Sequence, residues 1–235
     1  MPSITYSRVV CLSHVIAPGI PCWPGDPPVE FEAVADLKQQ GYRLRRFSVG
    51  EHSATHLNAP AGFFLARPGV DAFPPAALVA PAVLLDVQVK AAVNPDYTIC
   101  QEDILGWEKE HGQLPAGSVV VVLTGWQERW QSPETFFNQD GRGQMHYPGF
   151  GPDCTRWLLA ERGIAGVGTD APGVEPGSDS TYSVNRLLLA DGWRIVLENL
   201  TGLEQLPPRG ATLVTGILRL KDGTGSRASV LAFIP

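Results

Sequence analysis

The sequence predicts an α/β fold in which helices cover a central mixed sheet. Three observations predict it: a β-rich N-terminal half, an apolar strand–helix–strand succession after residue 118, and a length of 235 residues without a shift in composition. A chain of this length can bury one substantial core. We therefore expect a single domain over residues 1–235.

The N-terminal strands are separated by a proline-rich loop. Residues 8–16 predict a first strand, and residues 20–28 contain too many prolines for a regular helix. In that loop Trp23 is either a rigid aromatic plane for stacking on a ring-shaped substrate or a hydrophobic plug over the core. Residues 29–36 and 41–50 follow as paired strands. Alternation in the second strand slips by one position, which is typical of a β-bulge.

The middle of the chain predicts two strands joined through a helix. Thr98 and Gln101 resemble a capping box at the start of this helix, and Gly112 predicts its end. The valine-rich run after it is continuous, as in a strand covered on both faces. The predicted elements are a loop (61–69), a short helix (75–79), a strand (82–87), the helix that ends at Gly112 and a strand (118–123).

The second half predicts a right-handed strand–helix–strand crossover, because a helix that ends before Gly163 separates two apolar strands. The Gly- and Pro-rich loop after the second strand lies at a carboxyl end, where open α/β sheets bind ligands. The predicted elements are a helix (153–162), a strand (164–169), a loop (171–180), a short helix (184–189), a strand (193–197), and two strands (211–220 and 227–234) joined by a turn at 222–225.

The net charge of −6 argues against a nucleic-acid or anionic-membrane partner. For the basic cluster of Arg43, Arg45 and Arg46, a solvated strand face or a subunit contact is favoured over phosphate binding. No apolar run approaches the ~18 residues of a membrane span, and the N-terminus has no secretory pattern. We expect a cytoplasmic protein whose four cysteines are reduced.

The segment 50–60 carries the chemistry that the sequence offers. In an extended segment side chains alternate faces, so His52, His56 and Asn58 would project to one side. On a helix Asn58 would point away from the two histidines. Two imidazoles and an amide oxygen can hold a divalent cation with positions open for water and substrate. The spacing alone leaves open that these are two ordinary histidines beside a turn.

This segment resembles the His-x-Gly-Thr-His-x-Asp-x-Pro-x-His motif of the cyclase family of metal-dependent hydrolases, which includes bacterial kynurenine formamidases and isatin hydrolases. The resemblance implies a swivelling β/β/α fold, a small-molecule substrate and a homodimer or homotetramer. It covers nearly the whole chain, through Trp23-Pro24-Gly25-Asp26, Leu123-Thr124-Gly125-Trp126, Tyr147-Pro148-Gly149-Phe150, Val167-Gly168-Thr169-Asp170 and Val196-Leu197-Glu198-Asn199-Leu200.

The chain departs from the family motif at the positions that hold a second metal. Asn58 stands where the family has a bridging Asp, Gly62 where it has a third His, and Asn185 where it has a downstream His. A neutral amide offers one oxygen and no charge, so it cannot bridge two cations. The resemblance therefore implies one divalent metal on His52, His56 and Asn58, with Zn or Mn favoured over Mg.

The remaining site residues follow from this assignment. Glu198 is the expected catalytic base, with metal ligation or an ion pair with Arg186 as alternatives. Trp23, His146 and Asn185 are expected to bind substrate. The function expected is opening of an amide, lactone or cyclic imide by metal-activated water. The alternatives are a metal-dependent lyase or cyclase, and a metal-free relative that binds a small ring compound.

Overall fold

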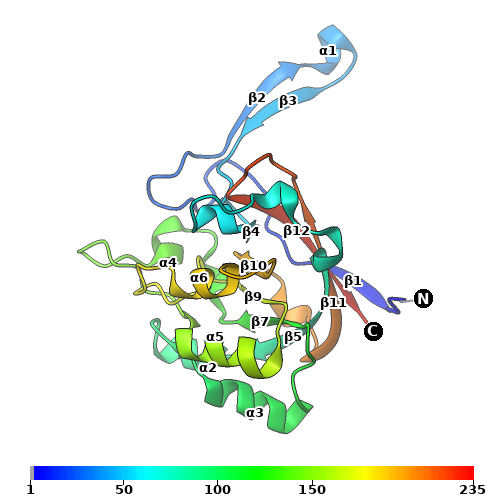
Figure 1. Cartoon of the computed structure of the whole chain (residues 1–235). Coiled ribbons are helices and arrows are strands. Elements are labelled where there is room, and N and C mark those ends of the chain that lie inside the picture. The colour runs from blue at the N-terminus through cyan, green and yellow to red at the C-terminus, as the bar shows by residue number, and fades with distance from the viewer. Residues whose placement is uncertain (1–2) are drawn as a thin grey trace.

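The structure, a computed structural model, describes residues 3–235. Its centre is a mixed sheet in the order β1-β12-β11-β5-β7-β9-β10-β4 (Figure 1). Because β12 also pairs with β4, the sheet closes into a barrel that leaves out only β1. The strands are β1 (Arg8–Cys11), β4 (His56–Asn58), β5 (Val79–Asp86), β7 (Val119–Leu123), β9 (Gly166–Thr169), β10 (Ile195–Glu198), β11 (Arg209–Ile217) and β12 (Gly225–Ile234).

The barrel is mixed because β5, β7, β9 and β10 run parallel to one another, whereas every pairing that involves β4, β11 or β12 is antiparallel. The parallel strands are connected by crossovers that contain the helices, as parallel connections require. The helices are α1 (Leu37–Gln40), α2 (Gln88–Val93), α3 (Gln101–His111), α4 (Pro133–Phe137), α5 (Pro152–Trp157) and α6 (Ser183–Leu189). Short 3₁₀ turns span Pro60–Gly62, Val70–Ala72, Pro75–Leu78, Trp126–Arg129 and Leu203–Gln205, and a π-helical turn, Leu158–Arg162, extends α5.

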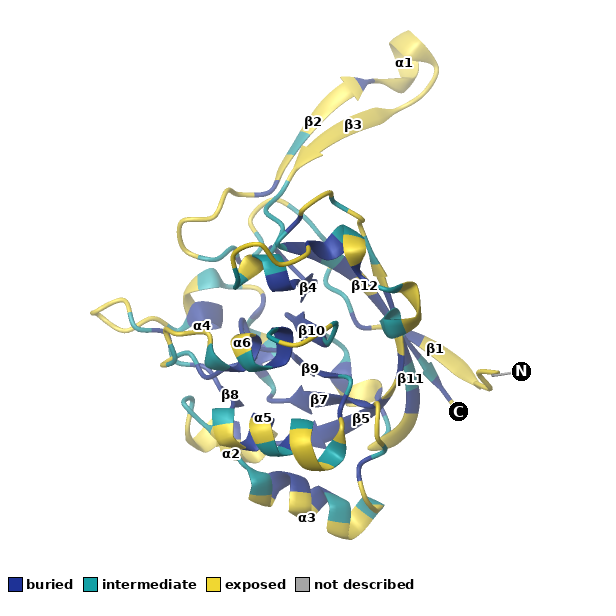
Figure 2. Cartoon of the chain, in the orientation of Figure 1, coloured by how far each residue is buried: buried dark blue, intermediate teal, exposed yellow. Residues whose placement is uncertain are grey.

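Strand β7 lies between two apolar cores, and all five of its residues are buried (Figure 2). Val119 and Val121 face the barrel interior, where they pack in one cluster with Leu57, Leu197 and Leu213. The alternate residues of β7 face outward. Val120 and Val122 belong to a second cluster that contains Ile104 of α3, Leu158 after α5 and Leu188 of α6. The predicted strand with both faces covered is therefore confirmed.

Strands β2 (Glu30–Ala35) and β3 (Leu44–Ser48) form a separate antiparallel ribbon that projects from the barrel with α1 at its tip (Figure 1). The predicted pairing of these strands is confirmed. The register shifts between Ala33 and Ala35, so the bulge lies in β2 and not in β3, where the sequence placed it. Every residue of β3 is exposed.

Most other predicted elements are present with shifted ends. The first strand is shorter than predicted, because it ends at Cys11. The capping box of α3 consists of Cys100 and Asp103, not Thr98 and Gln101, because the Asp103 carboxylate accepts the Cys100 N–H at 2.9 Å. Helices α1, α2 and α4 were not predicted. Two strands, β6 (Thr98–Ile99) and β8 (Gly149–Phe150), pair apart from the barrel.

None of the helices described within residues 3–235 is long and apolar enough to cross a membrane.

Candidate functional site

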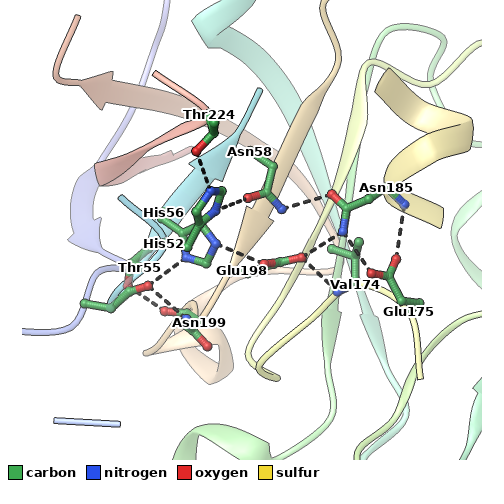
Figure 3. Close-up of polar contacts among 11 residues, drawn as sticks. His52, Thr55, His56, Asn58, Val174, Glu175, Asn185, Glu198, Asn199 and Thr224 are labelled. Carbon is green, nitrogen blue, oxygen red and sulfur yellow. Dashed lines mark hydrogen bonds and ion pairs between the residues drawn. The ribbon is translucent and has the colours of Figure 1, made fainter. Parts of the chain in front are cut away.

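A cavity of about 290 Å³ opens where β4 and β10 meet α6 and the loop that follows β9. Its lining combines polar and aromatic side chains, so the cavity can hold a ring compound against charged and amide groups. Figure 3 shows the contacts among polar residues at the site. The polar lining residues are Asp26, His52, His56, Asn58, Glu175, Asn185, Arg186, Glu198 and Asn199. The aromatic residues are Trp23, Phe63, Phe137, Tyr147 and Tyr182.

The pairing of β4 with β10 brings the side chains of His56 and Glu198 together. Strands β4 and β10 are antiparallel, and their register sets His56 directly opposite Glu198. Directly opposed residues of an antiparallel pair project to the same face, so the imidazole and the carboxylate meet. Nε2 of His56 lies 3.0 Å from Oε2 of Glu198. The alternative ion pair with Arg186 is wrong, because Arg186 donates to the backbone oxygens of Thr181 and Phe63.

The predicted strand from His52 to Asn58 is correct only for its second half. Strand β4 begins at His56, and Ala54 before it has a left-handed backbone with φ of 55°. This conformation is unusual for a residue with a Cβ. The Asn199 side chain stabilises it by donating to the Ala54 carbonyl oxygen at 2.9 Å. A turn, and not strand alternation, therefore brings His52 to the cavity beside His56.

A hydrogen bond locates one proton of His56, on Nδ1. Nδ1 lies 2.9 Å from the Ala54 carbonyl oxygen, which can only accept, so Nδ1 carries a proton. Nε2 is buried and makes no hydrogen bond of good geometry within residues 3–235, although Glu198 is close. In neutral His56 the lone pair of Nε2 would face a carboxylate. The pair therefore needs either a protonated imidazole or a cation.

A chain of amides fixes the orientation of His52. Nδ2 of Asn185 donates to both Glu175 and Glu198, at 3.0 and 3.1 Å. The Asn185 oxygen consequently accepts from Asn58 at 2.9 Å. The oxygen of Asn58 then faces Nδ1 of His52 at 2.9 Å, so this nitrogen is the donor in the hydrogen-bonded network. Asn185 thus connects two carboxylates to the histidine pair (Figure 3).

The two buried carboxyl groups have opposite pKa shifts. Burial and the charge of Glu198 raise the pKa of Glu175 to about 8. Burial also opposes the ionisation of Glu198, but contacts with His56 and the Asn185 amide hold its pKa below the ordinary value. At neutral pH the raised pKa favours a protonated Glu175, and the lowered pKa favours an ionised Glu198. Pairs with divergent pKa values are typical of acid–base sites. Sequence reasoning missed Glu175, although its place in the loop after a parallel strand was a signal.

Among the aromatic residues that line the cavity, Trp23 was predicted as a site residue and the others were not. Trp23 lines the cavity and packs edge-to-face on Phe137, with ring centroids 5.9 Å apart. The two alternatives for Trp23 are thus compatible, because one edge packs on the protein while the side chain borders the cavity. Phe137 belongs to the unpredicted helix α4. Tyr147 belongs to the motif Tyr147-Pro148-Gly149-Phe150, which predicts no role for its hydroxyl group.

His146 lies apart from the other predicted site residues. It does not line the cavity, and its Nδ1 contacts both carboxylate oxygens of Asp96, at 3.0 and 2.8 Å. The hydrogen bond with Asp96 raises the pKa of His146. This residue therefore ties the loop before Tyr147 to residue 96 instead of reaching the cavity.

A cation at this site would need an amide ligand. Within residues 3–235 no three His, Cys, Asp or Glu side chains cluster as metal ligands, so Asn58 has to contribute its oxygen. Nδ1 of His52 and the Asn58 oxygen lie 2.9 Å apart in a hydrogen bond, so a cation bound by both atoms would replace the proton between them. The unpartnered Nε2 of His56 supplies a free lone pair. The donor set fits one divalent cation.

Known proteins resemble this chain along nearly its whole length. Residues 10–176 match the family model named Cyclase. The chain is 32% identical to an isatin hydrolase of Roseibium aggregatum, over 97% of this chain and 92% of that protein. It is 24% identical to a kynurenine formamidase of Erythrobacter litoralis, over 97% and 95%. The solved structure of isatin hydrolase A from Labrenzia aggregata bound to benzyl benzoate superposes with a TM-score of 0.89 at 33% identity, over 97% of this chain and 93% of that one.

Proposed function

This chain belongs to the cyclase family and is a hydrolase, and on that premise we propose that it cleaves an amide C–N bond in a small ring compound. The observation that carries the proposal is the buried pair of His56 and Glu198 in the wall of a partly aromatic cavity. A carboxylate held in this way can take a proton from a water molecule as the water attacks a carbonyl carbon. The same cavity has room for the aromatic part of the substrate.

The chain supplies both a base and an acid for this reaction. Glu198 accepts the proton of the attacking water, while the new C–O bond forms at the carbonyl carbon. Glu175 is protonated at neutral pH and lines the same cavity, so it can donate a proton to the nitrogen when the C–N bond breaks. Asn185 donates to both carboxyl groups and holds them on one side of the cavity.

The proposal includes one divalent cation on His52, His56 and Asn58. Zn or Mn is favoured over Mg, because two of the three ligands are imidazoles. A bound cation of this kind acidifies a water molecule and polarises a carbonyl group. The unpartnered Nε2 of His56 supports the assignment, and the single amide in place of a carboxylate limits the site to one metal.

The substrate proposed is an amide or cyclic imide joined to an aromatic ring. Relatives named isatin hydrolase and kynurenine formamidase support this class. Trp23 and Asn185 both line the cavity and contribute to substrate binding, Trp23 as an aromatic surface and Asn185 as a polar contact. His146 has no part in this proposal, because it contacts Asp96 outside the cavity.

Turnover of a substrate panel tests the function. Purified protein is incubated with N-formyl aromatic amines, isatin and lactones, with and without a chelator. The masses of the products are then measured by mass spectrometry. We expect addition of one water to an amide, and loss of turnover with the chelator. Conversion without added water would indicate a lyase or cyclase. Binding without conversion in metal-loaded protein would indicate a relative that only binds its ligand.

We also propose that the protein forms a homodimer or homotetramer and works in the cytoplasm. The projecting ribbon of β2 and β3 supports assembly, because a two-stranded ribbon alone is marginally stable in water. Its exposed apolar side chains include Val34, Leu37, Leu44 and Phe47. The partner that we propose for this ribbon is a second copy of the same chain, because such a copy is present wherever the protein is.

A further inference from the structure

Tyr147 presents an uncommitted hydroxyl group to the cavity. The residue is only 3% exposed and lines the cavity. No residue within 3–235 makes a hydrogen bond with its hydroxyl group, whereas His52, Asn58, Asn185 and Glu198 all have partners. A buried tyrosine normally satisfies its O–H. This one retains a donor for whatever enters the cavity.

Two glycines, which have no Cβ, allow the loop after β9 to pack closely against the Tyr147 ring. A Cβ on Gly173 would lie 2.9 Å from the Tyr147 hydroxyl oxygen, and a Cβ on Gly177 would lie 2.9 Å from Cδ1 of the ring. Contacts this short do not occur between real Cβ atoms and their neighbours. The loop after β9 therefore forms a close-fitting cradle around Tyr147. The phenol cannot turn away without moving this loop.

The cradle also sets the hydroxyl group near the reacting carboxyl groups. Gly173 precedes Val174, whose backbone N–H donates to Oε1 of Glu198 at 3.2 Å. Glu175 follows directly and lines the same cavity. Burial, and then the charges of Glu198 and Glu175, hold the pKa of Tyr147 well above its ordinary value. The phenol thus keeps its proton while a neighbouring carboxylate is ionised.

We propose that the Tyr147 hydroxyl donates a hydrogen bond to the carbonyl oxygen of the substrate and stabilises the oxyanion that forms when water attacks. The inference rests on the proposed amide hydrolysis. The phenol keeps its proton throughout: the water gives its proton to Glu198, the carbonyl π-electrons move to oxygen, and Tyr147 stabilises that negative charge. A preformed donor in a site that excludes water contributes more to the transition state than to the ground state.

The kinetic test uses Tyr147→Phe, which keeps the ring in its cradle and removes only the hydroxyl. We expect kcat to fall about 100-fold or more, the usual effect of losing one oxyanion donor, with KM changed by less than about threefold. Gly173→Ala should lower kcat as well, because its Cβ displaces the hydroxyl. Gly141→Ala, with open space around the new Cβ, is the control and should behave as wild type.

A double variant separates displacement of the hydroxyl from damage to the loop. In Tyr147→Phe combined with Gly173→Ala the close contact is gone, so the alanine should cause little further loss beyond Tyr147→Phe alone. Additive losses would overturn the assignment. So would a Tyr147→Phe variant that retains kcat within about threefold of wild type.

A spectroscopic test does not depend on turnover and therefore separates this inference from the proposed function. Formanilide labelled with ¹³C at the carbonyl is bound to the wild type and to Tyr147→Phe, both treated with the chelator so that the amide is not hydrolysed, and its carbonyl resonance is recorded. A downfield shift in the wild type that is absent in the variant supports the hydrogen bond even if no substrate is hydrolysed. Equal shifts in both proteins, or no binding to the wild type, would overturn it.

Discussion

Nε2 of His56 and Oε2 of Glu198 face each other at 3.0 Å, and the two residues are only 2% and 6% exposed. Since Nδ1 of His56 already donates to a backbone carbonyl, this contact holds either an imidazolium–carboxylate pair or a cation that both groups approach. Removal of one partner from a buried charged pair leaves the other without compensation. The two residues are therefore coupled in charge, and a variant of either one tests both.

Glu198→Gln should keep the fold and most of the bound metal but lower kcat about 100-fold or more, because an amide cannot accept the proton of water. Turnover of the hydrolysed substrate and metal content are measured on the same preparation. Loss of metal from this variant would make Glu198 a ligand. If both turnover and metal content stayed at the wild-type level, the base would have to be another residue.

His52→Ala and His56→Ala should each abolish binding of the divalent cation, because each removes one of only two imidazole ligands. Asn58→Asp should strengthen binding, because it adds a negative charge to the site. Metal per chain is measured by mass spectrometry after loading with Mn or Zn and removal of the excess. His146→Ala, outside the cavity, is the control and should retain full metal content. Full retention by His56→Ala would contradict the assignment.

Glu175→Gln should change how stability depends on pH. The pKa of Glu175 is raised from 4.5 to about 8, so the unfolded chain ionises first as pH increases and the wild type loses stability between these values. The variant lacks this titration, and its stability relative to wild type should therefore increase from pH 4.5 to 8 by an amount on the order of a few kcal/mol.

Urea unfolding at several pH values measures this difference. The amide introduced by Glu175→Gln cannot accept both of the hydrogen bonds that Asn185 donates to the carboxyl group, which adds a cost that is independent of pH. The slope with pH, and not the absolute difference, is therefore the diagnostic quantity. Glu161→Gln, an exposed glutamate on the π-helical turn, is the matched control. A difference between Glu175→Gln and wild type that is flat across the window would mean that Glu175 is ionised in the folded protein.

Phe47→Ser should shift the protein toward its monomer, because it removes an apolar ring that is 54% exposed on the projecting ribbon. Light scattering behind size-exclusion chromatography measures the mass. We expect a multiple of 25.3 kDa for the wild type and a smaller mass for the variant at the same concentration. Val89→Ser, at an exposed valine on α2, is the control. A wild-type protein found only at 25.3 kDa would exclude the assembly.

The sequence predicted those parts of the fold whose signals are local. A continuous run of valines indicated β7, helical spacing closed by glycine indicated α3 and the helix before Gly163, and the loop after the crossover was expected at a ligand-binding edge. These signals need only neighbouring residues, because strand and helix periodicities are set by backbone geometry. Closure of the sheet could not be predicted, since it depends on the pairing of β12 with β4 across more than half of the chain.

By itself the sequence determined which polar side chains to expect together: two histidines, Asn58, Asn185 and Glu198 were predicted as site residues, and all of them line one cavity. Only the tertiary structure decided how they meet. Asn199 supports the left-handed Ala54 from 145 positions away, and this contact replaces the strand that alternation predicted. Tertiary packing also raised the pKa of Glu175 and left the Tyr147 hydroxyl without a hydrogen-bond partner among the described residues. Both properties depend on what surrounds a group in space and not on its neighbours along the chain.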